Sequence, residues 1–212
     1  MTDRFALRAH CRQDVCAPSV TWRVFCAIEL SETVRAIVLQ HIARLREAAP
    51  EAKVSWSRDG NLHLTLKFLG EIPRTSVGDF STAASRAVAG LTPFSILLEH
   101  TGVFPKHGQP RVLWIGIGDS SGRLAELHER LENDSAQAGF EKEGRPFHPH
   151  LTIARARQPH HASALAAAHQ LLEFEPQEIA VSELSVIRSE LSSAGSKYTV
   201  VSRHALGLSD RL

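Results

Sequence analysis

The sequence predicts a fold of two similar lobes, each built from strands and helices. Segments with the two-residue periodicity of strands alternate with segments that have the 3.6-residue periodicity of helices. The order strand–helix–strand–helix–strand occurs twice at nearly equal spacing, because Ile28 precedes His63 by 35 residues and Ile117 precedes His150 by 33. Each copy also carries a His-Leu-Thr segment at the same place. Alternating chains often look repetitive by accident, so this shared segment is the observation that favours a duplication.

The first half is predicted to form three strands and two helices. An apolar, β-prone run over residues 22–29 predicts the first strand. Ser31 is a predicted N-cap, with Glu32 behind it, for an amphipathic helix that ends near Ala48. The remaining elements are a strand at 62–69 that stops at Gly70, a helix at 77–89 and a strand at 94–104.

The second half repeats this order after a turn-rich segment that follows Phe104. The predicted elements are a strand at 111–118, a helix at 121–138, a strand at 149–155, a helix at 162–172 and a strand at 178–188. A last strand over 198–206 returns through the Ser-Ser-Ala-Gly turn at 192–195.

Composition is that of an ordinary globular protein, with 43% hydrophobic and 22% charged residues among 212. The net charge of +1 means that any contact with nucleic acid must come from a local basic patch. Cys11, Cys16 and Cys26 have no second cluster to complete a zinc site or a disulfide framework. The N-terminal residues lack the apolar run of a secretion signal, and no run is long enough for a membrane helix. We therefore expect a cytoplasmic protein.

The spacing within each His-Leu-Thr segment has a physical meaning. Residues i and i+2 of a strand point to the same face, so His63 presents its imidazole beside the hydroxyl of Thr65 while Leu64 points into a core. His150 and Thr152 make the same arrangement. If the lobes meet about a pseudo-twofold axis, the two His/Thr pairs face each other across a cleft.

Two facing His/Thr pairs suit in-line attack on phosphorus. The acid and the base must stand on opposite sides of the phosphorus, and histidine, with an unperturbed pKa of about 6.5, can serve as either near neutral pH. The threonine hydroxyls can donate hydrogen bonds to the non-bridging phosphate oxygens. A cyclic phosphodiester carries one charge and a strained ring, so we expect this chemistry to need no metal and no cofactor.

At these residues the sequence resembles a known family. The segments at 61–70 and 145–155 are similar to the two signature (HXTX) segments of the two-histidine phosphoesterase superfamily. They are most similar to the bacterial and archaeal RNA 2′,3′-cyclic phosphodiesterases, once called 2′-5′ RNA ligases. Residues 23–28 and 111–116 resemble that family's opening and middle strands. The resemblance covers one bilobal domain at about 22–206, which leaves 1–21 as an N-terminal extension and 207–212 as a C-terminal tail.

The resemblance implies a bilobal α+β fold, with mainly antiparallel sheets, helices and an active-site cleft between the lobes. It implies a metal-independent hydrolase, which we expect to be monomeric, that opens RNA ends or nucleotides with a 2′,3′-cyclic phosphate to 2′-phosphates. It also implies that His63 donates a proton to the 3′ oxygen and that His150 accepts the proton of water. The residues predict the pair, and only the family predicts the two roles.

Two cationic side chains near the motifs are candidate phosphate ligands. Strand alternation from His63 places Lys67 on the cleft face, although a solvated lysine near a strand end is the simpler interpretation. Arg155 belongs to the second signature segment, but ideal alternation from His150 places it on the opposite face. Either the strand is irregular there and Arg155 binds phosphate, or Arg155 is structural.

Phe25 and His148 also have two interpretations each. Phe25 can stack on a base, but a strand aromatic more often packs in a core. His148, with His160 and His161, invites a zinc site that no cysteine or carboxylate spacing supports. The other histidines stand alone in the sequence and are expected at the surface or in packing.

Two alternatives to the predicted activity stay open. One is an enzyme for another small substrate, such as a nucleotide or ADP-ribose cyclic phosphate, or for the cleavage of 2′-5′ linkages. The other is a module that binds nucleotides or RNA ends without turnover. Two intact His-x-Thr motifs argue against the second alternative.

Overall fold

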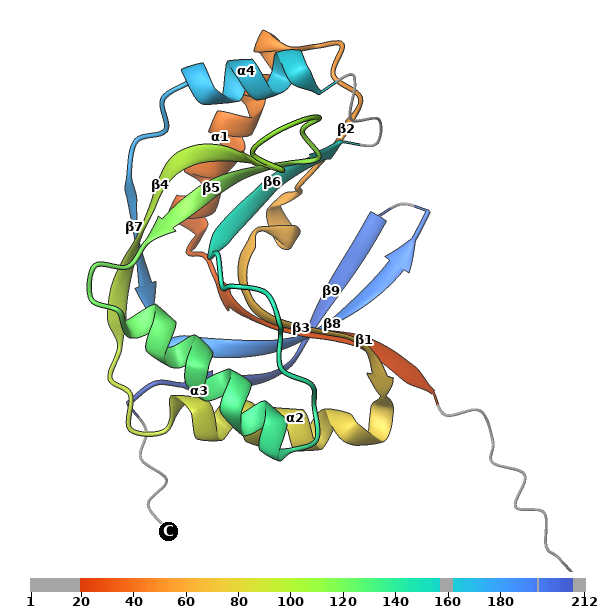
Figure 1. Cartoon of the computed structure of the whole chain (residues 1–212), viewed down its shortest axis with the longest axis vertical. Coiled ribbons are helices and arrows are strands. Elements are labelled where there is room, and N and C mark those ends of the chain that lie inside the picture. The colour runs from red at the N-terminus through yellow and green to blue at the C-terminus, as the bar shows by residue number, and fades with distance from the viewer. Residues whose placement is uncertain (1–19, 157–161, 194, 208–212) are drawn as a thin grey trace, which may run out of the picture.

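The computed structural model describes residues 20–156, 162–193 and 195–207 (Figure 1). The predicted N-terminal extension therefore lies almost entirely outside the described residues, as do all but the first residue of the predicted tail, and His160 and His161. Two antiparallel sheets form the centre of the molecule, and each carries two helices on its outer side (Figure 1). Within the described part of the chain, no helix is long and apolar enough to cross a membrane.

Each sheet has a strand with a His-Leu-Thr segment near one edge. The first sheet has the order β3-β1-β8-β9, and the second has the order β2-β6-β5-β4-β7. The strands of the first sheet are β1 (Thr21–Glu29), β3 (His63–Pro73), β8 (Glu183–Ser192) and β9 (Gly195–Ala205). The strands of the second sheet are β2 (Val54–Trp56), β4 (Phe94–Phe104), β5 (Val112–Gly118), β6 (His150–Ala156) and β7 (Gln177–Val181).

The helices bury their apolar stripes against the outer faces of the sheets. Helices α1 (Glu32–Ala48) and α4 (Ser163–Leu171) cover the second sheet. Helices α2 (Val77–Val88) and α3 (Arg123–Gln137) cover the first. Ser31 is the N-cap of α1, as predicted, and its hydroxyl accepts a hydrogen bond from the Val34 amide at 3.3 Å. Two short 3-10 turns, Asp59–Asn61 and Arg74–Ser76, flank β3.

The two lobes are not the two halves of the sequence. The first half contributes β1 and β3 to the first sheet, but its strand β4 joins the second sheet beside β5. The second half contributes β5 and β6 to the second sheet, but its strand β8 joins the first sheet beside β1. Helices α1 and α3 are exchanged in the same way, because each covers the sheet of the other half. This exchange ties the lobes together and fixes β3 next to β6.

Two strand predictions were wrong, and one short strand was not predicted. The strand predicted to stop at Gly70 continues to Pro73 as β3. The predicted strand at 178–188 is two strands, because the chain leaves the second sheet after Val181 and enters the first sheet at Glu183. Ser182, between them, is a polar residue without the glycine or proline that signals a break, although its carbonyl accepts the Leu206 amide at 2.8 Å. The three-residue strand β2 was not predicted, since it is too short to show a periodicity.

Candidate active site

The His-Leu-Thr segments lie at matching places in the two sheets. His63 and Thr65 of β3 are half-buried, and the apolar residue that follows each of them is buried. His150 and Thr152 of β6 show the same pattern. Strands β3 and β6 contact each other where the two sheets approach. The structure therefore brings the two predicted His/Thr pairs into one region.

A pocket of about 580 Å³ opens between these strands. His63, Thr65 and Thr152 line it together with Arg155. His150 is not on its wall, yet the positive charge of Arg155 lowers the pKa of both His63 and His150. Arg155 is therefore close enough to act on both histidines.

Each motif strand contains the same irregularity, one residue after its threonine. Leu66 of β3 has no partner on β1, and Ile153 of β6 has no partner on β5. Such a β-bulge adds one residue to a strand and reverses the alternation of faces beyond it. Leu66 and Lys67 are consecutive buried residues for this reason, and so are Ile153 and Ala154.

The bulge in β6 explains the position of Arg155 and favours its interpretation as a phosphate ligand. The strand is irregular, and the side chain of Arg155 lies exposed on the face that lines the pocket. Ser57, directly after β2, holds the bulge in place: its amide donates to the Ile153 carbonyl and its hydroxyl to the Thr152 carbonyl, both at 2.8 Å. The sequence did not point to Ser57, because its role depends on the unpredicted strand β2.

The matching bulge in β3 overturns the placement of Lys67 on the cleft face. Lys67 is only 4% exposed and lies under the sheet, facing α3. Its ammonium donates to both carboxylate oxygens of Glu132, at 2.9 and 2.8 Å, and to the Glu141 carbonyl at 2.8 Å. Since all three donors are used inside the protein, Lys67 is a structural residue and not a phosphate ligand.

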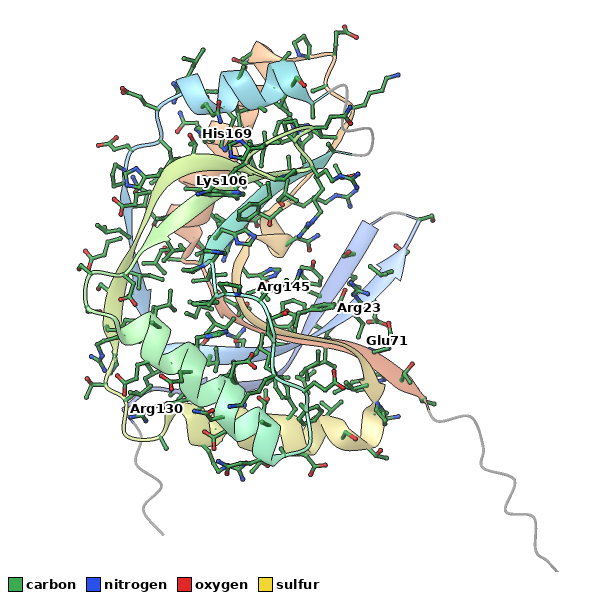
Figure 2. All side chains as sticks on the ribbon, in the orientation of Figure 1. Arg23, Glu71, Lys106, Arg130, Arg145 and His169 are labelled. Carbon is green, nitrogen blue, oxygen red and sulfur yellow. The ribbon has the colours of Figure 1, made fainter. Side chains whose placement is uncertain are left out.

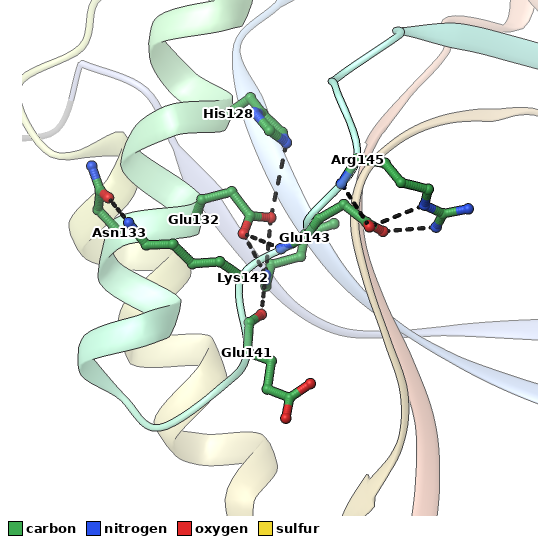
Figure 3. A network of polar contacts seen from close by, with 8 residues as sticks. His128, Glu132, Asn133, Glu141, Lys142, Glu143 and Arg145 are labelled. Atoms are coloured by element: carbon green, nitrogen blue, oxygen red, sulfur yellow. Dashed lines mark hydrogen bonds and ion pairs between the residues drawn. The ribbon is translucent and has the colours of Figure 1, made fainter.

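Glu132 connects this buried ion pair to the segment that leads into β6 (Figure 3). Its carboxylate also accepts the Glu143 amide at 3.0 Å, and the His128 ring lies 3.8 Å from its other oxygen. His128 stacks on Phe147, with 3.8 Å between ring centroids and 10° between planes. The network therefore fixes the chain immediately before His148 and His150.

His63 lies between two aromatic rings of the first sheet. Its ring stacks on Phe25 with centroids 4.7 Å apart and meets the edge of Tyr198 at 5.2 Å. Burial lowers the pKa of His63 to about 4, against the raising effects of a hydrogen bond with the Asn61 backbone and the charge of Glu29. Phe25 is only 3% exposed, which favours its interpretation as a packing residue, although it also lines a pocket beside His63.

His150 is held in an equivalent way in the second sheet. Its Nδ1 atom lies 2.7 Å from the His148 carbonyl, which makes Nδ1 the protonated nitrogen and leaves Nε2 free to accept a proton. The Phe104 ring meets it edge-on at 5.1 Å, and the Trp114 ring lies 6.3 Å away. Burial lowers the pKa of His150, partly offset by the hydrogen bond to His148. Both histidines therefore bond the carbonyl of the residue two positions earlier.

Two histidines expected to stand alone form a buried pair behind the site. His41 Nε2 lies 3.3 Å from His169 Nδ1, and His169 Nε2 lies 3.0 Å from the Trp114 carbonyl. His169 is a residue of α4, buried on the side that packs on the second sheet (Figure 2). Burial lowers the pKa of both, that of His41 to about 4, so the pair is neutral at pH 7. This pair supports β5 at Trp114, whose ring lies near His150.

Two adjoining pockets meet at His63. We call the pocket described above, which extends toward Arg46 and Arg58, the arginine pocket. The second, of about 480 Å³, extends toward Arg23 and Phe68, and we call it the aromatic pocket. Both share five lining residues, which are His63, Thr65, Arg155, Ser196 and Tyr198.

The outer walls of these pockets were not predicted from the sequence. The β8–β9 hairpin supplies Ser196 and Tyr198, and the Asn61 side chain donates to the Ser196 carbonyl at 3.2 Å. Arg23 projects from β1 near this hairpin (Figure 2). The hairpin turn itself was predicted, but its position over His63 depends on the crossing of β8 into the first sheet.

The zinc interpretation of His148 gains no support. Among residues 20–156, 162–193 and 195–207, no three histidine, cysteine or acidic side chains lie close enough together to hold a metal ion. His160 and His161, which that interpretation required, lie outside these ranges.

Comparison with known proteins agrees with this geometry. An RNA 2′,3′-cyclic phosphodiesterase of Thermus thermophilus is 33% identical over 192 residues, covering 87% of this chain and 90% of that protein. One of Methanothermobacter thermautotrophicus is 32% identical over 180 residues, covering 84% and 95%. The crystal structure of Escherichia coli LigT complexed with 3′-AMP matches with a TM-score of 0.70 and 27% identity, over 89% of this chain and all of LigT.

A crystal structure of a protein from Thermus thermophilus also matches with a TM-score of 0.70, at 29% identity, over 87% of this chain and 97% of that one. These matches confirm the α+β fold of two antiparallel sheets with helices. The family model described as the 2′-5′ RNA ligase superfamily matches residues 34–192, a range that includes both His-Leu-Thr segments. The chain therefore belongs to the 2′-5′ RNA ligase superfamily.

Proposed function

We propose that this protein hydrolyses 2′,3′-cyclic phosphates at RNA ends to 2′-phosphates, with His63 as proton donor and His150 as proton acceptor. The observation that carries the proposal is the pair of strands with matching bulges, which brings His63, Thr65, Thr152 and Arg155 to one pocket and leaves His150 within reach of the Arg155 charge. The relatives named RNA 2′,3′-cyclic phosphodiesterases and the 3′-AMP complex of LigT support the choice of substrate.

The cyclic phosphate would lie between the two histidines. Thr65 and Thr152 would donate hydrogen bonds to its non-bridging oxygens, and Arg155 would balance the negative charge. No carboxylate is found among the described residues that line either pocket, which favours the binding of an anion there.

Hydrolysis then needs one proton transfer on each side of the phosphorus. Water attacks the phosphorus while His150 Nε2 takes its proton, and the bond between phosphorus and O3′ breaks. His63 gives a proton to the departing O3′, and the phosphate stays on O2′. Solvent then reprotonates His63 and deprotonates His150, which completes the cycle without a redox change.

The low pKa of His63 gives substrate binding a defined effect. A donor must be protonated, yet burial holds the pKa of His63 at about 4 in the free protein. A phosphodiester anion beside the ring favours the imidazolium and raises this pKa. We therefore expect binding of the anion to be accompanied by proton uptake.

The reaction can be tested with adenosine 2′,3′-cyclic phosphate, with the product assigned by phosphorus NMR before and after exhaustive treatment with EDTA. Formation of adenosine 2′-phosphate at an unchanged rate is the expected result. A 3′-phosphate product would reverse the assignment of the leaving oxygen, and binding without turnover would indicate a binding module. Activity that EDTA removes and zinc or manganese restores would contradict the metal-independent mechanism.

A further inference from the structure

The arginine pocket contains cations that the proposed reaction does not use. Arg46 at the end of α1 and Arg58 after β2 line it, in addition to Arg155. No ion pair within the described parts of the chain involves Arg46 or Arg58. Nearby Asp59, the obvious partner for Arg58, is bound instead to Arg35 at 2.8 Å.

The groups described beside these two guanidinium groups are neutral. The Arg46 guanidinium lies over the Trp56 ring, 5.4 Å from its centroid, which limits the orientations of its side chain. The Arg58 guanidinium lies beside Gly195 of the β8–β9 hairpin, where an added Cβ would be 3.7 Å from it. The net charge of the chain is only +1, so the binding of a second anionic group requires a local concentration of positive charge. Arg46 and Arg58 provide it.

The proposed reaction determines which part of the substrate can occupy the two pockets. Both are lined by His63, and neither is lined by His150. If His63 protonates O3′, the terminal ribose lies on the His63 side, and water enters from the side of His150. The space in both pockets is therefore available to the terminal nucleoside and to what precedes it in the chain.

The walls of the pockets distinguish a place for a base from a place for a phosphate. The aromatic pocket offers Phe68, which is 51% exposed, with Arg23 over its ring at 4.7 Å from the centroid. A base needs such an apolar, stackable surface. The arginine pocket also has an aromatic ring, that of Trp56, but the Arg46 guanidinium lies over it. Its other walls offer guanidinium groups and serine hydroxyls, which are ligands for phosphate oxygens.

We propose that Arg46 and Arg58 form a second phosphate subsite, which binds the phosphate on the 5′ oxygen of the terminal nucleoside. This inference rests on the proposed function, since that function defines where the terminal ribose lies. The subsite makes an RNA strand, or a nucleotide with a 5′-phosphate, a better substrate than a nucleoside cyclic phosphate with a free 5′-hydroxyl.

The test compares three substrates: adenosine 2′,3′-cyclic phosphate, the same compound with a 5′-phosphate, and the dinucleotide ApA with a 2′,3′-cyclic phosphate end. In the wild type we expect kcat/KM to be at least about 10-fold higher for the second and third than for the first. In Arg46→Ala/Arg58→Ala this ratio should fall to near one. The control Arg44→Ala/Arg86→Ala removes the same charge, from the exposed face of α1 and from α2, and should keep the wild-type ratio.

A binding experiment separates this subsite from the proposed reaction. By calorimetry, adenosine 2′-phosphate with a 5′-phosphate should bind the wild type about 10-fold more tightly than adenosine 2′-phosphate, and the double variant should lose this preference. If the preference is seen without turnover of any cyclic phosphate, the subsite stands and the proposed reaction fails. Equal binding of the two ligands by the wild type, or an undiminished preference in the double variant, would overturn the subsite.

Discussion

Phe68 of β3 and Arg155 of β6 occupy equivalent positions, five residues after His63 and His150 respectively, and both line the aromatic pocket. Each reaches this pocket because a bulge after the threonine shifts the strand by one residue. The residue before each of them, Lys67 or Ala154, is turned into the core by the same shift. The two strands thus share this bulge but present different chemistry: an apolar ring from one and a cation from the other.

Arg155→Met should lower kcat/KM on a cyclic phosphate by about 10²–10³-fold, the usual loss for one donor to a reacting oxyanion. The guanidinium lowers the pKa of both His63 and His150, so its removal should also raise both of these pKa values. Steady-state kinetics and NMR titration of the ring carbons check the two effects. A variant with unchanged kinetics would place Arg155 outside the reaction.

Lys67→Met is the matched change on the opposite face, and we expect it to affect stability instead. It leaves the buried carboxylate of Glu132 without its partner, which costs about 3–5 kcal/mol in the free energy of unfolding. The second variant Lys67→Met/Glu132→Leu should recover much of this loss, because no unpaired charge remains. Urea denaturation measures the stability, and a large rise in KM of the folded variant would show that Lys67 does contact substrate.

Thr65→Val and Thr152→Val each keep the shape of the side chain but remove a donor to the phosphate. We expect each to reduce kcat by about 10²–10³-fold. Thr65→Ser and Thr152→Ser, which keep the hydroxyl, serve as controls and should retain most of the activity. Wild-type rates in both valine variants would mean that the shared His/Thr face does not bind phosphate.

The dependence of the rate on pH should differ between kcat/KM and kcat. Burial lowers the pKa of His63 to about 4 and that of His150 below its ordinary value, so both limbs of the kcat/KM profile should fall below pH 6.5. Bound phosphodiester favours both imidazolium ions, which should move the limbs of the kcat profile to higher pH. Rates between about pH 3 and 8, with circular dichroism to verify folding, provide the measurement. Limbs of kcat/KM above pH 7 would contradict the environment described for these residues.

The sequence was informative where side-chain type and spacing determine structure. Alternation over His63–Thr65 and His150–Thr152 correctly placed both pairs on one kind of face, and the repeated motif indicated two related sheets. Alternation failed only beyond Leu66 and Ile153, because a bulge changes the face of every following residue without changing the residue types. Lys67 was misplaced for this reason, and Arg155 had two interpretations.

Features that depend on contacts between distant segments of the chain left no comparable pattern in the sequence. The exchange of β4 and β8 between the sheets depends on the packing of the whole chain, and strand propensity does not encode it. The same is true of Arg46 and Arg58, which lie in ordinary surface segments and are brought to the pocket by α1 and by the unpredicted strand β2. Residues that act through tertiary contacts alone are those that local patterns miss.

The assignment of donor and acceptor is tested most directly by kcat for His63→Ala and His150→Ala on two substrates. On a nucleoside 2′,3′-cyclic phosphate, each variant should lose at least about 10²-fold, the low end for one general acid or base. A 3′-deoxynucleoside 2′-(4-nitrophenyl phosphate) has a leaving group that needs no proton, and it has no neighbouring 3′-hydroxyl that could attack the phosphorus in place of water. On this substrate His63→Ala should recover most of its rate, whereas His150→Ala should stay slow because water must still be deprotonated. Recovery by His150→Ala would reverse the two roles, and wild-type rates of both variants on the cyclic phosphate would contradict the mechanism.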